Sequence, residues 1–193
     1  MQTIARYMSL SVLSMLFCIA AQPSDSQSGL DNNNALPPFG HTFFCLRYPI
    51  DCVRTLSTMA LPISQEDRWR KMNSVNTAVN ASIAPKPDAD QVNTHWLIAP
   101  RQGDCNDYAV TKRHELLKAG WPSSSLLLAE VTLISTGEHH LILIVKGAGA
   151  NWVLDNLKPD IERVTAMRNG YALDRVESGD NPKLWTHSRL GLS

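Results

Sequence analysis

Three residue types in this sequence occur in the order of a nucleophilic catalytic triad. Cys105 is followed by the pair His139 and His140, and then by Asp155. A cysteine hydrolase needs a thiolate to attack a carbonyl, an imidazole to carry the proton, and a third group to orient that imidazole. These residues therefore predict acyl-transfer chemistry that starts from Cys105, provided that the fold brings them together.

The other cysteines leave Cys105 without a partner. Of the four cysteines, Cys18 lies in a predicted signal peptide, and Cys45 and Cys52 bracket the loop LRYPID, in which Pro49 favours a turn. In an oxidising compartment we expect Cys45 and Cys52 to form a disulfide. The chain-entropy model gives so short a loop about 2.5 kcal/mol of stabilisation. Cys105 is then an odd thiol in an exported protein, which calls for a functional explanation.

Cys105 is expected at the start of a helix. The helical spacing after it ends at Gly120, just before Pro122, and is carried by Tyr108, Ala109, Leu116 and Leu117. Unpaired backbone N–H groups and the helix dipole at such a terminus favour a thiolate.

An earlier helix is predicted from Ser64 to Pro85. Ser64 is a good N-cap, and acidic residues follow it in the first turn. Its apolar residues are spaced to pack against a core: Trp69, Met72, Val75, Val79 and Ile83.

After the second helix, the spacing of the apolar residues changes from that of a helix to that of a strand. The runs 126–135, 139–146 and 151–157 are rich in aliphatic and β-branched residues and are separated by turns that contain glycine. Two helices followed by hairpin-linked strands predict an α+β domain, with helices packed on an antiparallel β-sheet.

The turn between the second and third strands decides which histidine meets Asp155. A two-residue loop at 147–148 would place His140 directly opposite Asp155, and a four-residue loop would place the two diagonally on one face. A loop with an odd count would select His139 instead. An even loop therefore predicts the triad Cys105, His140 and Asp155.

Each of these residues also has a structural interpretation. A cysteine at a helix start is often a small buried hydrophobe. A histidine at a strand start is often a surface residue, and Asp155 could simply end a strand. A zinc site formed by Cys105, His114, His139 and His140 is a weak alternative. Adjacent histidines on a strand point to opposite faces, and no other tight ligand pair is present.

The domain organisation follows from composition. Residues 1–21 combine one basic residue with an uncharged, mostly apolar run, as in a signal peptide. Residues 22–38 are rich in Gln, Pro, Ser, Asp and Asn, and we expect a disordered linker. The folded domain is expected over 39–193, in the periplasm or outside the cell, without stable membrane insertion.

The charge balance argues against nucleic-acid binding. The chain has 193 residues, with 18 Lys and Arg against 18 Asp and Glu. No excess of basic residues is available to neutralise phosphates. The length is sufficient for one domain with a substantial core.

Several separated motifs resemble the bacterial transglutaminase-like cysteine peptidases. They are GDCNDYA at 103–109, GEHHLIL at 137–143 and WVLDNL at 152–157, together with VNTAVN at 75–80 and GWP at 120–122. The resemblance implies a papain-like, transglutaminase-type fold, with Cys105 as nucleophile, His140 as base and Asp155 as the group that orients it. The best understood members are periplasmic peptidases that cleave large surface adhesins and so release biofilms.

The resemblance also raises calcium as a cofactor. Those peptidases typically carry an Asp and a Glu that flank the cysteine and help to bind calcium. Here the flanking residues are Asp104 and Asn106, so an oxygen ligand is kept and one charge is lost. A calcium ion near Asp104 and Asn106 is therefore an expectation that the resemblance brings.

Three functions are consistent with these observations. The leading hypothesis is an exported cysteine endopeptidase that acts on a protein or peptide substrate, such as a cell-surface adhesin. The alternatives are a transglutaminase or cell-wall amidase, which would share the acyl-thioester intermediate, and a non-catalytic binding module. For any acyl transfer, the backbone N–H of Cys105 would help to hold the oxyanion, and Gln102 is the candidate for a second donor.

Overall fold

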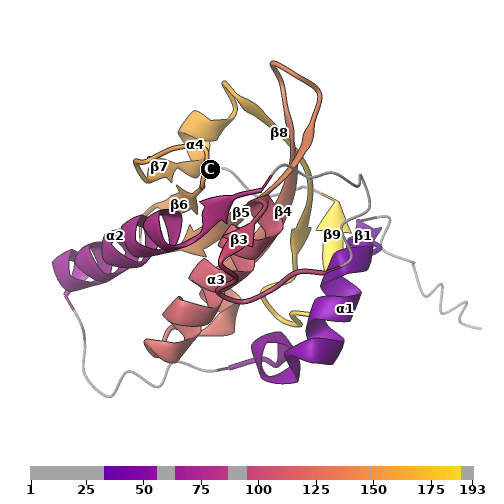
Figure 1. Ribbon diagram of the computed structural model, residues 1–193, viewed down its shortest axis with the longest axis horizontal. Helices are drawn as coiled ribbons and strands as arrows, with labels where there is room; N and C mark the ends of the chain where they lie inside the picture. The colour runs from indigo at the N-terminus through magenta and orange to yellow at the C-terminus, as the bar shows by residue number, and fades with distance from the viewer. Residues whose placement is uncertain (1–32, 56–63, 87–94, 148, 188–193) are drawn as a thin grey trace, which may run out of the picture. The chain divides into compact units, whose positions relative to one another are not determined.

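The computed structural model describes residues 33–55, 64–86, 95–147 and 149–187 (Figure 1). The α-helices are α1 (Phe39–Arg47), α2 (Gln65–Ser82), α3 (Cys105–Lys118) and the short α4 (Val164–Met167). Two 3₁₀ turns, η1 (Pro49–Cys52) and η2 (Ser123–Ser125), and a small parallel pair, β2 (Ala84–Pro85) with β3 (Gln102–Gly103), complete the connections. Within these ranges, no helix has both the length and the apolar composition needed to cross a bilayer.

The main sheet has seven antiparallel strands in the order β1-β9-β8-β4-β5-β6-β7. Its strands are β1 (Asn34–Ala35), β4 (Leu126–Leu133), β5 (His139–Lys146), β6 (Asn151–Leu154), β7 (Glu162–Arg163), β8 (Tyr171–Glu177) and β9 (Trp185–His187). The mixture of helices with this sheet confirms the predicted α+β class.

Strand β5 is buried on both faces because helices cover each side of it. Leu141, Leu143 and Val145 pack with apolar residues of α1, α2 and α3. The alternate residues Ile142 and Ile144 pack with residues of α4. This alternation follows the two-residue period of a strand, and it holds β5 firmly between two layers of core.

Both predicted long helices are confirmed. The Ser64 hydroxyl accepts the N–H of Asp67 at 3.0 Å and caps α2, as expected. The phenol of Tyr108, in α3, donates to the carbonyl of Ile83, at the C-cap of α2, over 2.5 Å. This bond joins the end of α2 to the first turns of α3, side by side in Figure 1.

The predicted disulfide is present. Cys45 and Cys52 are bonded, with their Cα atoms 5.4 Å apart, inside the range that a disulfide permits. The bond joins α1 to η1. Asp51, in η1, contacts α3 through His114, whose Nδ1 lies 2.9 Å from its carboxylate, so the crosslinked loop is attached to the helix that begins at Cys105.

The N-terminal boundary differs from the prediction. Asn34 and Ala35 form β1 and pair with Thr186 and Trp185 of β9, so two residues within the predicted linker belong to the sheet. These residues are ordered because they pair with a strand far along the chain. Composition alone does not reveal such a partner. The predicted signal peptide and residues 22–32 lie outside the described residues.

Candidate active site

Cys105 is the first residue of α3 and is held there by a capping box. The Asp104 carboxylate accepts the N–H of Asn106 at 2.9 Å and that of Asp107 at 3.4 Å. Asp107 in turn accepts the N–H of Asp104 at 3.2 Å. These bonds satisfy N–H groups that a helix start leaves unpaired, and they fix the direction in which the first turn presents Cys105.

Asp107 also anchors the segment that leads to Cys105. Its Oδ1 accepts the N–H of Leu97 at 2.7 Å, and one turn further along α3 the Thr111 hydroxyl accepts the N–H of Ala99 at 2.9 Å. Burial raises the pKa of Asp107 to about 6, and the charge of Asp104 adds to this, while the N–H donors and Lys86 oppose it. A Cβ atom at Gly103 would lie 2.5 Å from Asp107 Oδ2, so glycine is required there.

The β5–β6 hairpin selects His140. Leu143 pairs with Leu154, which gives the four-residue loop 147–150 and places Asp155 diagonal to His140. The His140 Nε2 and Asp155 Oδ1 atoms are 2.7 Å apart, and both side chains are buried. His139 is exposed, with its Nδ1 3.9 Å from Asp174.

Electrostatics favour an ionised pair at His140 and Asp155. Burial alone would lower the pKa of His140, but hydrogen bonds to Asp155 and Cys105, with their charges, outweigh it and raise the pKa to about 9. Burial would raise the pKa of Asp155, but His140, the Tyr171 hydroxyl and the Leu157 N–H lower it to about 2. Cys105 and Asp155 thus both raise the pKa of His140, and these three residues form one interacting set.

Residues that the sequence did not single out complete this set. The Tyr171 phenol donates to Asp155 Oδ2, and the Leu157 N–H donates to Oδ1 at 3.0 Å. The Asn80 amide donates to the Asp155 backbone carbonyl at 3.0 Å. Tyr171 lies in a strand that was not predicted. Asn80 belongs to the motif VNTAVN, which supported the family resemblance without indicating a role for this residue.

The residues expected to hold an oxyanion or a metal lie close to Cys105 in sequence. Gln102 is exposed in β3, two residues before the N-cap of α3. Asp104 and Asn106 offer oxygen atoms on either side of Cys105, and oxygen is the donor that calcium prefers. These two residues supply one carboxylate and one amide.

A second group of potential metal ligands contains the two cysteines of the disulfide. Among the described residues, His41 gathers with Cys45 and Cys52. Both sulfurs belong to the disulfide, which removes the thiolates that zinc would need. His114, considered as a zinc ligand beside Cys105, instead pairs with Asp51.

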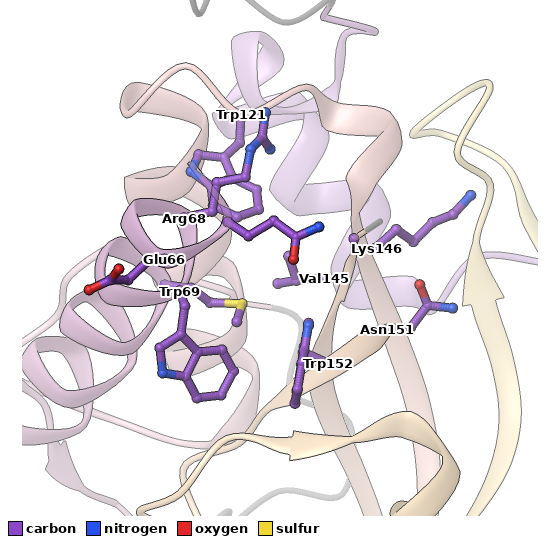
Figure 2. Close-up of a pocket in the computed structure, with 11 residues that line it drawn as sticks. Glu66, Arg68, Trp69, Trp121, Val145, Lys146, Asn151 and Trp152 are labelled. Carbon is purple, nitrogen blue, oxygen red and sulfur yellow. The ribbon is translucent and has the colours of Figure 1, made fainter. Parts of the chain in front are cut away.

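A pocket of about 880 Å³ lies away from this set (Figure 2). Trp69 and Trp152 face each other in it, with ring centroids 4.7 Å apart, and Arg68 lies over the Trp121 ring at 5.3 Å. Trp69 is eleven residues before Asn80 on α2, or ~16 Å along the helix axis. The pocket is therefore at the opposite end of α2 from Asp155.

Comparison with known proteins adds a family and a fold. The family model of the bacterial transglutaminase-like cysteine proteinases (BTLCP) matches residues 31–190. No curated protein sequence matches the chain.

Solved structures with a similar fold include LapG of Legionella pneumophila. The calcium-bound form is 20% identical with a TM-score of 0.54, over 65% of this chain and 74% of that one. The EGTA-treated form is also 20% identical with a TM-score of 0.54, over 65% and 69%. These matches confirm the predicted transglutaminase-type, papain-like fold.

Proposed function

The chain belongs to the bacterial transglutaminase-like cysteine proteinase family, and we propose that it is an exported endopeptidase that uses Cys105, His140 and Asp155 as its triad. The observation that carries the proposal is the 2.7 Å bond between His140 and Asp155, in a histidine whose pKa is also raised by Cys105. Export is supported by the Cys45–Cys52 disulfide and by the composition of residues 1–21.

The reaction would begin from a thiolate–imidazolium pair. The Cys105 sulfur attacks the carbonyl carbon of the scissile peptide, and His140 gives its proton to the leaving amine as the C–N bond breaks. A water molecule then attacks the acyl-thioester, and His140 takes a proton from that water. Collapse of this second intermediate releases the new carboxyl group and returns Cys105 to its thiolate.

Oxyanion stabilisation would come from the start of α3. The Cys105 N–H belongs to the first turn, where backbone N–H groups point out of the helix. Gln102 is the proposed second donor because the β2–β3 pair holds it near the N-cap of α3.

The substrate is proposed to be a protein at the cell surface, such as a large adhesin, whose cleavage would release biofilm cells. This follows from the family and from the proposed export. The peptidases of this family that are understood best act on such substrates.

Calcium is proposed to strengthen the first turn of α3 through Asp104 and Asn106. The positive charge would offset the negative charges of Asp104 and Asp107, which lie close together in the capping box. With one carboxylate and one amide we expect weak binding, roughly in the millimolar range. The thermal unfolding midpoint should therefore be higher in calcium than in EGTA, and Asn106→Asp should widen the difference. Equal midpoints for both proteins in the two solutions would exclude this site.

The proposed activity can be tested on the surface proteins of cells that lack this gene, because these proteins should still be uncleaved. We expect the purified protein to generate new protein N-termini, detected by mass spectrometry. Cys105→Ala and His140→Ala should generate none, whereas His139→Ala, a change of the exposed neighbour, should retain full activity. Cleavage by Cys105→Ala would overturn the proposal. Incorporation of an added amine donor, without cleavage, would instead show a transglutaminase.

A further inference from the structure

Tyr171 is a buried residue on the far side of β4 from His140. It begins β8 and pairs with Leu133 of β4, while His140 pairs with Val131 of the same strand. The two rings are nearly parallel, with an interplanar angle of 14° and centroids 6.1 Å apart. The sheet therefore places the Tyr171 phenol beside the proposed triad, without contact to the surface.

The phenol completes the hydrogen bonding of Asp155. One carboxylate oxygen, Oδ1, accepts hydrogen bonds from His140 at 2.7 Å and from the N–H of Leu157 at 3.0 Å. The other oxygen, Oδ2, accepts a hydrogen bond from the Tyr171 hydroxyl. A carboxylate can rotate about its bond to Cβ, and donors on both oxygens stop that rotation.

We propose that Tyr171 is a positioning residue of the triad, whose hydroxyl holds Asp155 Oδ2 so that Oδ1 stays aligned with His140. The inference rests on the proposed function and extends it to a residue that does not touch the reacting atoms. Tyr171 acts through Asp155, and its ring also forms one wall against the imidazole.

The hydroxyl is suited to this role because it remains a donor. Burial raises the pKa of Tyr171, and the hydrogen bond to Asp155 and the negative charge of that carboxylate raise it further. The Lys158 ammonium lies 5.1 Å from the centroid of the Tyr171 ring and packs on its face. The ring is thus held on more than one side, and the phenol cannot swing away from Asp155.

The test compares two tyrosines that lose the same group. Tyr171→Phe keeps the ring against His140 and removes only the hydroxyl. Tyr108→Phe removes an equally buried hydroxyl, which donates to Ile83 in the helical layer. Both variants should lose similar thermal stability, so a difference between them in reactivity belongs to the triad.

Two readouts apply to these variants. The first is the rate at which iodoacetamide alkylates Cys105, followed by mass spectrometry of the peptide; it needs no substrate. Losing one hydrogen bond to a charged group should slow alkylation about tenfold in Tyr171→Phe, and Tyr108→Phe should match the wild type. The second is cleavage of a substrate, where kcat should fall about tenfold in Tyr171→Phe with KM unchanged.

Equal alkylation rates in Tyr171→Phe and Tyr108→Phe would overturn the inference, as would a loss confined to KM. If the wild type cleaves nothing but Tyr171→Phe still slows alkylation, the proposed peptidase activity fails while the positioning role stands. If the wild type cleaves a substrate but both variants behave alike, the positioning role fails while the proposed peptidase activity stands.

Discussion

At the scale of single residues, Asp155 determines how the candidate site is charged. Burial works against its ionisation, yet its pKa is about 2 because His140, Tyr171 and the Leu157 N–H all donate to it. The carboxylate is therefore an anion throughout the neutral range, and it holds His140 in its protonated form.

Asp155→Asn should lower turnover by about 10²–10⁴-fold and leave residual activity. An amide has a single acceptor oxygen, so it cannot receive both His140 and Tyr171, and its NH₂ must face one of those donors. Steady-state kinetics would measure the loss. Residual activity is expected because Cys105 and His140 remain, and turnover equal to that of Cys105→Ala would show that Asp155 does more than orient the ring.

The pH profile should have an alkaline limb near the raised pKa of His140. The proposed mechanism needs the imidazolium, so activity should fall as pH rises through about 9. In Asp155→Asn this limb should move to lower pH, because burial then acts with less opposition. Initial rates across the range would check this, and a limb that is unchanged in Asp155→Asn would contradict it.

The ionisation of His140 also affects the stability of the folded protein. The folded pKa of His140, about 9, exceeds the ordinary value of 6.5. Its contribution to folding is therefore complete below pH 6.5 and is lost as the pH rises through about 9.

At the scale of elements, α3 is the part that the site depends on most. Asp104 and Asp107 cap its N-terminus, and the Asp107 carboxylate also accepts the N–H of Leu97. The position of Cys105 is thus determined by bonds from the preceding segment as well as by the helix itself.

Asp107→Asn should reduce both stability and activity. An amide cannot accept the N–H groups of Leu97 and Asp104 with both of its ends, so one partly buried donor loses its partner at a cost of about 1 kcal/mol. Ser64→Ala is the matched control, since it removes a capping bond of α2 at a cost of about 1 kcal/mol. Urea unfolding and turnover should show lost activity in Asp107→Asn alone; equal activity in the two variants would mean that the cap does not position Cys105.

At the scale of the whole molecule, Arg113 connects the helical layer to the sheet. Its guanidinium donates to the carbonyls of Leu126 and Asp51 and pairs with Glu177 at 3.0 Å, all in a buried setting. The second oxygen of Glu177 accepts the Leu128 N–H at 3.0 Å. Segments far apart in the sequence therefore meet on one ion pair.

Burial raises the pKa of Glu177 to about 7. Above that pH, Glu177→Gln should lower the free energy of unfolding by about 3–5 kcal/mol, because the Arg113 charge would then be buried without its counterion. Glu130→Gln is the control. Glu130, in β4, pairs with Arg175, in β8, but both side chains are more than a fifth exposed, so the loss should stay below about 1 kcal/mol. Urea unfolding would compare them, and equal losses would contradict the role given to burial.

The local parts of this fold were predictable, and the distant pairings were not. Capping by Ser64 and the spacing of apolar residues predicted α2, and the parity of the β5–β6 loop predicted His140. The position of β8 beside β4 depends on a pairing some forty residues apart, with a register shift at Glu130 and Val131. A local period cannot encode such a contact, so Tyr171 could not be assigned to the site from the sequence.

The pair Trp69 and Trp152 gives the molecule an optical signal of its own. Two indoles at 4.7 Å with an interplanar angle of 62° couple their electronic transitions, and such coupling produces a circular dichroism couplet in the ultraviolet. One indole is carried by α2 and the other by β6, so the couplet would report whether that helix lies against the sheet. Spectroscopy could therefore follow the docking of α2 during refolding without any label and without altering a residue near Cys105.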